Sequence, residues 1–287
     1  MLTTRFAPSP TGFLHLGHAF SALSAATYAA ARGGRMLLRI EDIDRTRCRP
    51  EFEQAIYEDL AWLGIAWETP VRRQSDHFAD YAEALDALRA LGVVYRCFRT
   101  RTEILDEIAR APHLPAAGPE GPRFVGAPLA ADEERSRLAE GAPFAWRLSI
   151  VRARAVLGPA YEALSFDAEG EGPNGEAGRI AATPDIFGDV VVARKDAGSS
   201  YHLASVHDDA LQGVTHVVRG QDLFHAAHLH SLLQALLGYP EPRYVHHRLL
   251  TDESGRRLAK RDRAATLRAL REAGVGAGEV RRRLGFD

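Results

Sequence analysis

The chain has 287 residues, of which 46% are hydrophobic and 26% charged, and its formal net charge is −2 at pH 7. This length supports a sizeable core in one large or two modest domains, and the balanced charge excludes a nucleic-acid binder that is basic throughout. The two cysteines, Cys48 and Cys97, exclude a disulfide framework. Since neither a signal peptide nor a bilayer-spanning apolar stretch occurs, we expect a cytoplasmic protein without membrane contact.

The predicted elements begin with a strand–loop–helix–strand unit, the usual start of a parallel α/β sheet. Its parts are an apolar strand at 2–6, a Pro-, Ser- and Gly-containing loop at 7–17, a helix at 18–32 and a second strand at 35–40. An acidic run at 41–44 follows the second strand. Amphipathic spacing predicts two further helices, at 50–63 and 78–91.

The middle of the chain has a different pattern. Two stretches rich in Gly with Pro, Ala or Glu, at 111–128 and 167–178, predict loops, so the segment 95–182 is expected to be an insertion with its own small fold. The α/β pattern then returns, with strands predicted at 189–193 and 215–218 and helices at 203–212 and 224–237.

The loop after the first strand reads Ala7-Pro-Ser-Pro-Thr-Gly-Phe-Leu-His-Leu-Gly-His18. Because a helix N-terminus presents unpaired N–H groups and the positive end of its dipole, this loop suits an anion. Gly17 allows close approach to the backbone, and His15 and His18 can donate to phosphate oxygens. The alternative, which a lone His-x-x-His would favour, is a Pro-rich turn with a histidine near a helix start.

A second constellation, Arg257-Leu-Ala-Lys-Arg261, follows a glycine turn at Gly255. Lys260 is one of two lysines in a chain whose positive charge is otherwise carried by arginine. A compact ammonium suits the charge that develops on a polyphosphate. Taken alone, the motif is also compatible with an ordinary basic surface loop.

Together, the motifs that begin at Arg5, His15, Glu41 and Arg257 resemble the glutamyl/glutaminyl branch of class I aminoacyl-tRNA synthetases. The resemblance implies an α/β fold in which a Rossmann-like parallel sheet is split by an α+β insertion and followed by a short helical C-terminal segment. The implied divisions are 1–94 and 183–240 for the halves of a catalytic domain, 95–182 for an insertion similar to an acceptor-binding region, and 241–287 for the second signature and a tail.

The resemblance also implies roles for individual residues. ATP, with Mg²⁺, is expected between the halves of the sheet, and His15, His18 and Lys260 are expected to stabilise a pentavalent phosphate during attack by the amino-acid carboxylate. The implied binding residues are Pro8, Gly17, His18, Leu258, Lys260 and Arg261 for ATP, and Arg5, Ala7, Ser9, Glu41, Tyr201 and Arg219 for L-glutamate.

A glutamate site needs a cation for the side-chain carboxylate and an anion for the ammonium group. Arg5 and Arg219 are the candidate cations, because a planar guanidinium can hold a carboxylate through two hydrogen bonds. Glu41 is the candidate anion. For Arg219, the alternative is a surface ion pair with Asp222.

The chain departs from the full-length enzymes of that branch near its end. It stops 26 residues after Arg261, so no anticodon-binding domain is expected. This short architecture resembles the subfamily that esterifies glutamate onto queuosine in the anticodon of tRNA(Asp), and the expected protein is a monomer acting on that tRNA. A truncated enzyme that charges a tRNA 3′ end and a catalytically silent RNA-binding paralogue are the alternatives.

The zinc site common in that subfamily is expected to be lost. Its members often carry Cys-x-Cys after a tyrosine and a later cysteine, whereas here Arg99 stands two residues after Cys97 and no later cysteine occurs. Because a structural zinc needs about four ligands, we predict that zinc is absent. Packing around Phe144 and Trp146 is then expected to hold the insertion.

Other polar residues give less specific patterns. Asp208 and Asp209 are expected to be structural, through capping or pairing with an arginine. His225, His228 and His230 lie on one predicted helix, where metal binding is the less favoured alternative and no role is assigned.

The segment 243–287 contains twelve Lys/Arg and six Asp/Glu. On a nearly neutral chain, such a local excess of positive charge is typical of a surface that binds RNA phosphates. A solvated helix face is the alternative.

Overall fold

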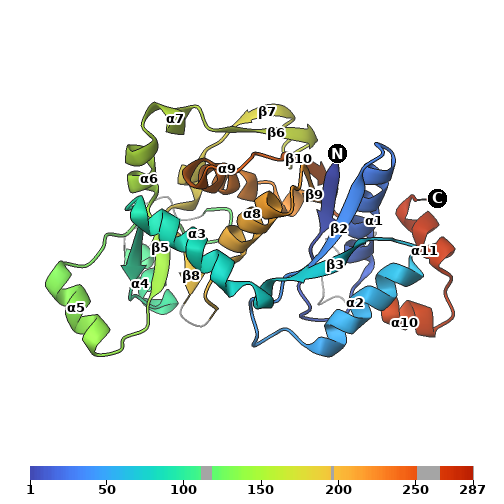
Figure 1. Cartoon of the computed structure of the whole chain (residues 1–287), viewed down its shortest axis with the longest axis horizontal. Coiled ribbons are helices and arrows are strands. Elements are labelled where there is room, and N and C mark those ends of the chain that lie inside the picture. The colour runs from blue at the N-terminus through green and yellow to red at the C-terminus, as the bar shows by residue number, and fades with distance from the viewer. Residues whose placement is uncertain (111–117, 195–196, 251–265, 287) are drawn as a thin grey trace.

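The computed structural model describes residues 1–110, 118–194, 197–250 and 266–286 of the chain. Within these ranges the strands form three sheets, one parallel, one mostly parallel and one antiparallel, with helices packed around them (Figure 1). The α/β fold class expected from the sequence is confirmed, together with its parallel sheet and helical C-terminal segment.

The first sheet consists of parallel strands β1 (Thr3–Phe6), β2 (Arg35–Ile40) and β3 (Glu68–Arg73), in that order. Helices α1 (Leu16–Ala30) and α2 (Pro50–Trp62) connect the strands. All of β1 and most of β2 are buried, as is usual for parallel strands that are covered on both faces. The expected strand–loop–helix–strand unit is therefore present.

Helix α1 begins two residues before the predicted start because His15 caps it. The Gly17 amide donates to Nδ1 of His15 at 3.0 Å, and the His15 amide donates to Nδ1 of His18 at 3.2 Å. This is a reciprocal capping box in which two imidazoles replace the more usual hydroxyl and carboxylate.

The second sheet has the order β7-β6-β10-β9. Strands β6 (Ser165–Gly170), β10 (Arg243–His247) and β9 (His216–Gly220) are parallel, and β7 (Gly178–Ala181) forms an antiparallel hairpin with β6. The associated helical elements are α8 (Tyr201–Leu211), a 3₁₀ turn (Gln221–Leu223) and α9 (Ala226–Leu237).

The first and second sheets meet at β1 and β9. The Thr215 amide donates to the Thr3 carbonyl oxygen at 3.0 Å, and the Thr3 amide donates to the Thr215 hydroxyl at 2.9 Å. We call this junction between β1 and β9 the seam. The strand that follows β1 lies on one side of the seam, and the strand that follows β9 lies on the other side. Ligands in open α/β sheets bind at such a reversal, outside the carboxyl ends of the strands.

The third sheet is antiparallel, with strands β4 (Val94–Cys97), β5 (Ala145–Leu148) and β8 (Val190–Arg194) in that order. It lies at the opposite end of the molecule from the C-terminal helices (Figure 1). The helices of this part are α3 (Phe78–Ala90), α4 (Arg101–Arg110), α5 (Ala131–Ala139), α6 (Ile150–Leu157) and α7 (Pro159–Glu162), with 3₁₀ turns at Gln74–Asp76 and Pro184–Phe187.

Sheet pairing corrects the predicted loop at 167–178. Its first residues belong to β6, and the connection between β6 and β7 spans 171–177. Phe166 and Ala168 are buried on one side of β6, and hydrogen bonding to β10 stabilises a strand that its Gly- and Glu-rich composition does not indicate. The hairpin of β6 and β7 lies in the predicted insertion, yet β6 pairs with β10, which lies outside the insertion. Conversely, β8 follows the predicted insertion in sequence but pairs with β5, which lies inside it. The predicted domain division itself stays a prediction.

The C-terminal helices α10 (Leu267–Glu272) and α11 (Ala277–Leu284) pack against the first half of the fold. Leu267 and Val280 are fully buried in an apolar core shared with α1, α2 and the first two strands. The Leu267 amide also donates to the Leu14 carbonyl oxygen at 2.8 Å. The end of the chain is thereby fixed beside the loop that precedes α1.

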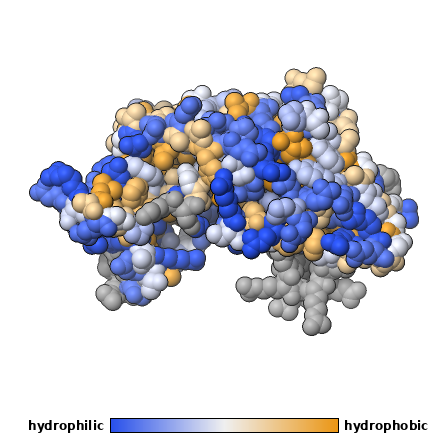
Figure 2. Space-filling view, turned by 60° about the horizontal axis from the view of Figure 1, so that its bottom comes forward, coloured by the Kyte–Doolittle hydropathy of each residue, from blue (hydrophilic) through white to orange (hydrophobic). Residues whose placement is uncertain are grey.

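The surface seen in Figure 2 is largely hydrophilic, with hydrophobic residues in small separate groups. Exposed large hydrophobic side chains, such as Val125, Val151 and Leu211, lie on different parts of the chain. Among the described residues, none of the helices is both long enough and apolar enough to cross a bilayer.

Candidate active site

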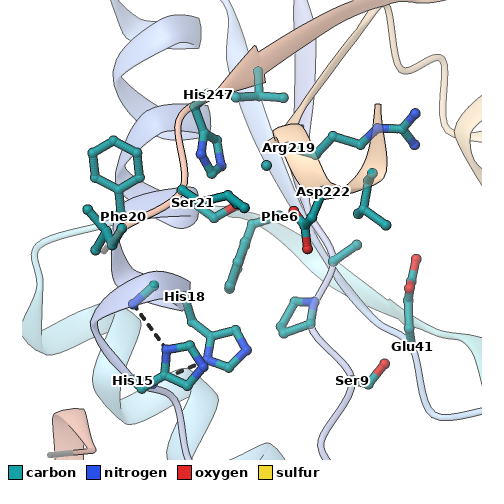
Figure 3. A pocket seen from close by; sticks show the side chains of 18 of the residues that line it. Phe6, Ser9, His15, His18, Phe20, Ser21, Glu41, Arg219, Asp222 and His247 are labelled. Carbon is teal, nitrogen blue, oxygen red and sulfur yellow. Dashed lines mark hydrogen bonds between the residues drawn. The ribbon is translucent and has the colours of Figure 1, made fainter. Parts of the chain in front are cut away.

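A cavity of about 630 Å³ opens at the carboxyl ends of β1 and β9, beside the start of α1 (Figure 3). Its volume is in the range of small-molecule sites, and its place at the seam is where ligands bind in open α/β sheets. Ten of the residues implied by the resemblance line it, namely Arg5, Ala7, Pro8, Ser9, His15, Gly17, His18, Glu41, Tyr201 and Arg219. Their individual roles stay predictions.

The residues of the second signature, Leu258, Lys260 and Arg261, lie outside the described residues. Its C-terminal flank is nevertheless close to the first signature, because Thr266 forms a β-bridge with His15. On the N-terminal side, Leu249 and Leu250 line the cavity.

His15 and His18 lie at one end of the cavity, away from Glu41 and Arg219 (Figure 3). Their ring centroids are 3.9 Å apart, and the capping hydrogen bonds at Nδ1 fix both ring orientations. A Cβ atom added to Gly17 would lie 2.9 Å from Cε1 of His15. A side chain at position 17 would therefore displace the His15 ring from the helix start.

Behind the other end of the cavity lies a buried network of charged side chains. Arg39 donates to Glu41 at 3.0 Å and to Asp209 at 2.7 Å, and Arg5 donates to Asp209 at 3.1 Å. Although burial favours the neutral acid, Arg5 and Arg39 lower the pKa of Asp209. The predicted structural role of Asp208 and Asp209 is confirmed, since Arg72 also donates to Asp208 at 2.7 Å.

Glu41 follows the last residue of β2 and lines the cavity. Burial raises the pKa of its carboxyl group, and the Arg39 and Arg5 guanidinium groups oppose that effect. The carboxylate is held in one orientation by Arg39, which is itself fully buried. A cationic group placed in the cavity would favour the ionised form.

Arg219, at the end of β9, differs from Arg5 in its surroundings. It is 3% exposed, and within the described part of the chain it makes no ion pair with a carboxylate. Its Nε donates to Nε2 of His246 at 3.4 Å, its guanidinium stacks over the Tyr244 ring at 4.9 Å, and its buried Nη2 has no hydrogen-bond partner there. The alternative of a surface ion pair with Asp222 is wrong.

Tyr201 is the first residue of α8 and lies between the cavity and the histidines of α9. Its ring is 5.8 Å from that of His230. Burial raises the pKa of its hydroxyl, so that it stays protonated and able to donate a hydrogen bond.

Several lining residues were not identified from the sequence. Phe20 lies three residues after Gly17 and Ser21 three residues after His18, and this helical spacing was an available signal. The others have the sequence pattern of ordinary core or connecting residues; they include Phe6, Val218, Leu223, Leu249 and Leu250. His247, a candidate for contact with ATP or RNA from its place near the second signature, also lines the cavity.

Cys97, the residue left from the zinc site of the subfamily, does not line this cavity and belongs to an apolar cluster. Cys97 is buried with Tyr95, Ile104 and Phe124. The predicted aromatic packing is present, since the rings of Phe144 and Trp146 are 5.7 Å apart in an edge contact. Among the described residues, no group of three His, Cys, Asp or Glu side chains is arranged to hold a metal ion.

The three histidines of the α9 region have separate environments. The Thr183 amide donates to Nδ1 of His228 at 3.0 Å, which gives that residue a structural role. His225 stacks on His228, whereas His230 points to the other side and contacts His202.

Comparisons with known proteins identify the family to which the chain is similar. The model of the family described as tRNA synthetases class I (E and Q), catalytic domain, matches residues 1–277. The Glutamyl-Q tRNA(Asp) synthetase of Rhodobacter capsulatus is 46% identical over 99% of this chain and 100% of its own length. Glutamate–tRNA ligase 2 of a Ruegeria species is 38% identical over 96% of this chain and 58% of its own length.

A solved glutamate tRNA ligase from Elizabethkingia meningosepticum, in complex with its amino acid, has a similar structure. It is 27% identical, with a TM-score of 0.70, over 91% of this chain and 52% of that protein. The chain therefore spans about half the length of the solved ligase.

Proposed function

Since the chain belongs to the class I tRNA synthetases of the E and Q type, we propose that this ligase activates L-glutamate with ATP and transfers it to queuosine in the anticodon of tRNA(Asp). The glutamate and ATP parts are supported by the cavity. The choice of acceptor is supported by the Rhodobacter capsulatus protein, whose name specifies tRNA(Asp) and whose full length is covered.

The observation that carries the proposal is the unmatched charge of Arg219. Its buried Nη2 donor has no partner among the described residues, and a buried unpaired donor costs about 1–3 kcal/mol. A glutamate side-chain carboxylate would satisfy that donor and supply the missing negative charge. Glu41, on the same side of the cavity, would then accept the ammonium group.

The opposite end of the cavity suits the nucleotide. His15 and His18 would bind phosphate oxygens of ATP, which enters as its magnesium complex, and Lys260 is assigned the same task from the sequence. The α-carboxylate of glutamate attacks the α-phosphorus, the bond to the β-phosphate oxygen breaks, and pyrophosphate leaves. The enzyme contributes position and charge, with no covalent intermediate on the protein.

In the second step, a hydroxyl of the acceptor attacks the carbonyl carbon of glutamyl-adenylate. An ester forms, AMP leaves, and the hydroxyl proton is released. For the proposed acceptor, the attacking oxygen belongs to the cyclopentene diol of queuosine.

Glutamate-dependent exchange of ATP with radiolabelled pyrophosphate tests the activation step. We expect exchange with glutamate and much less with glutamine or aspartate. A well-folded protein without any amino-acid-dependent exchange would instead be the catalytically silent paralogue.

The acceptor is tested separately, with labelled glutamate and tRNA(Asp) that contains or lacks queuosine. The tRNA is prepared both intact and without its 3′-terminal adenosine. We expect label on queuosine-containing tRNA in both preparations. Label that requires the 3′ adenosine and ignores queuosine would identify a truncated charging enzyme.

A further inference from the structure

A line of polar side chains runs from Arg219 to the segment 118–124. Nη1 of Arg219 lies 3.5 Å from Nδ1 of His230. Nε2 of His230 lies 3.2 Å from Nδ1 of His202, and Nε2 of His202 lies 3.1 Å from Oε2 of Glu120. We call Glu120, His202 and His230 the histidine relay. Both histidines are buried, whereas the Glu120 side chain is half exposed.

The direction of these hydrogen bonds follows from the chemistry of the first member. A guanidinium group has only donors, so Nδ1 of His230 must accept. A neutral imidazole with an acceptor at Nδ1 carries its proton on Nε2, and His230 therefore donates to Nδ1 of His202. By the same rule, Nε2 of His202 carries a proton and donates to Glu120. Each ring uses both nitrogens.

The relay orients Arg219 without neutralising it. Burial and the nearby Arg219 charge lower the pKa of His230 well below its ordinary value, and the same two effects lower that of His246 to about 2. The two imidazoles that contact Arg219 are thus uncharged acceptors. The negative charge of the relay lies at its far end, on Glu120, two imidazoles away.

Glu120 belongs to a segment with its own attachment to the fold. The Asp189 amide donates to the Phe124 carbonyl oxygen at 2.6 Å, and Gly118 and Gly121 form a β-bridge. Asp189 in turn accepts from the Tyr95 hydroxyl at 2.8 Å. The segment that carries Glu120 is therefore attached to the fold through Asp189, which belongs to neither α8 nor α9.

We propose that the histidine relay positions the Arg219 guanidinium for the glutamate side-chain carboxylate and so contributes to selection of glutamate over glutamine. This inference rests on the proposed function and deepens it. It assigns positioning roles to Glu120, His202 and His230, none of which lines the cavity. It also makes amino-acid recognition depend on the segment 118–124.

The main test compares Glu120→Ala with Glu120→Gln in glutamate-dependent pyrophosphate exchange. Loss of the acceptor in Glu120→Ala is expected to raise the KM for glutamate about 3- to 10-fold with a smaller change in kcat. Because the amide oxygen of glutamine can still accept from His202, Glu120→Gln should restore most of the affinity. Glu140→Ala, at the exposed glutamate that follows the last residue of α5, is the matched control and should have the wild-type KM.

A second pair of variants tests the relay inside the fold. His230→Leu and His228→Leu each remove a buried histidine from the same helix, but His228 does not contact Arg219. We expect His230→Leu alone to lower the ratio of kcat/KM for glutamate over that for glutamine. Thermal unfolding measures how much stability each variant loses.

The outcomes separate this inference from the proposed function. Without glutamate-dependent exchange in the wild-type protein, the proposed function fails. With exchange in the wild type, an unchanged KM in Glu120→Ala overturns the relay, and so does a Glu120→Gln variant that behaves like Glu120→Ala. Equal effects of His228→Leu and His230→Leu on the selectivity ratio would also overturn it.

Discussion

Arg219 occupies a position where charge and geometry can be tested separately. Arg219→Lys keeps the positive charge but loses the planar fork that can hold a carboxylate with two hydrogen bonds. A lost charge-assisted hydrogen bond corresponds to about 1.5–3 kcal/mol, so we expect the KM for glutamate in pyrophosphate exchange to rise about 10- to 100-fold. Arg243→Lys, on the exposed side of β10, is the control and should have no such effect. Equal KM values for the two variants would contradict the role assigned to Arg219.

Gly17 tests the phosphate end of the cavity. In Gly17→Ala the new methyl group would lie 2.9 Å from Cε1 of His15, so the imidazole must move. We expect the KM for ATP to rise, or kcat to fall, by at least about tenfold, since a misplaced catalytic group is costly. Glutamate binding measured by calorimetry without ATP should change little. Gly278→Ala in α11, where the nearest atom is 3.5 Å away, is the matched control.

The site residues that the sequence predicts lie in local motifs, whereas those that it does not predict depend on contacts between residues far apart in the sequence. Arg5, His15, Glu41 and Arg219 could be predicted because each lies in a recognisable motif, at the end of a strand or at the start of a helix. The contacts of the histidine relay could not, since Glu120 and His202 are 82 residues apart and their proximity depends on the assembled insertion. Spacing along the chain carries no signal for such a pair.

Among the elements, the prediction was best where a segment follows its own periodicity. Helices α1, α2 and α3 lie within two residues of their predicted bounds. Strand β6 was missed because its Gly- and Glu-containing sequence is a strand only through pairing with β10 and β7. Strand β3 was also missed, since it is mostly exposed and has no apolar alternation.

The contact between α2 and α10 contains a buried acid that gives a pH-dependent prediction. Asp59 is fully buried, neither carboxylate oxygen has a hydrogen-bond partner among the described residues, and the nearest cation is Arg271 at 3.5 Å. Burial raises its pKa from an ordinary value of 3.8 to about 6. Its contribution to stability is thus fully present below about pH 4 and is lost as the pH rises through 6.

Asp59→Asn removes this titration. At pH 7 we expect the free energy of unfolding of the variant to exceed that of the wild type by about 1–3 kcal/mol, from about 1.4 kcal/mol per pKa unit. The difference should vanish near pH 4. Urea denaturation at a series of pH values measures it, with Asp106→Asn in α4 as the exposed control. A constant difference over this range would rule out the raised pKa.

For the molecule as a whole, the C-terminal helices place exposed arginines on a chain of net charge −2. Arg282 and Arg283 of α11 are both exposed, and Arg283 pairs with Glu279. If this surface contacts tRNA phosphates, replacing both arginines with alanine should weaken tRNA binding and lower the slope of log affinity against log salt by about 1–2. Pyrophosphate exchange without tRNA should be unchanged. An unaltered slope would favour the solvated helix face.

The hydrogen bonds between Thr3 and Thr215 also have a consequence for synthesis of the chain. The two residues are 212 positions apart, so at about 5–20 residues per second β1 leaves the ribosome roughly 10–40 s before β9 exists to pair with it. Until then the strand edge that will form the seam is open to other chains. Arg5, whose charge will later be matched by Asp209, places a positive charge on that strand. An inward-pointing charge on an unpaired strand discourages edge-to-edge association, so the same side chain that later borders the cavity can protect the nascent protein from aggregation.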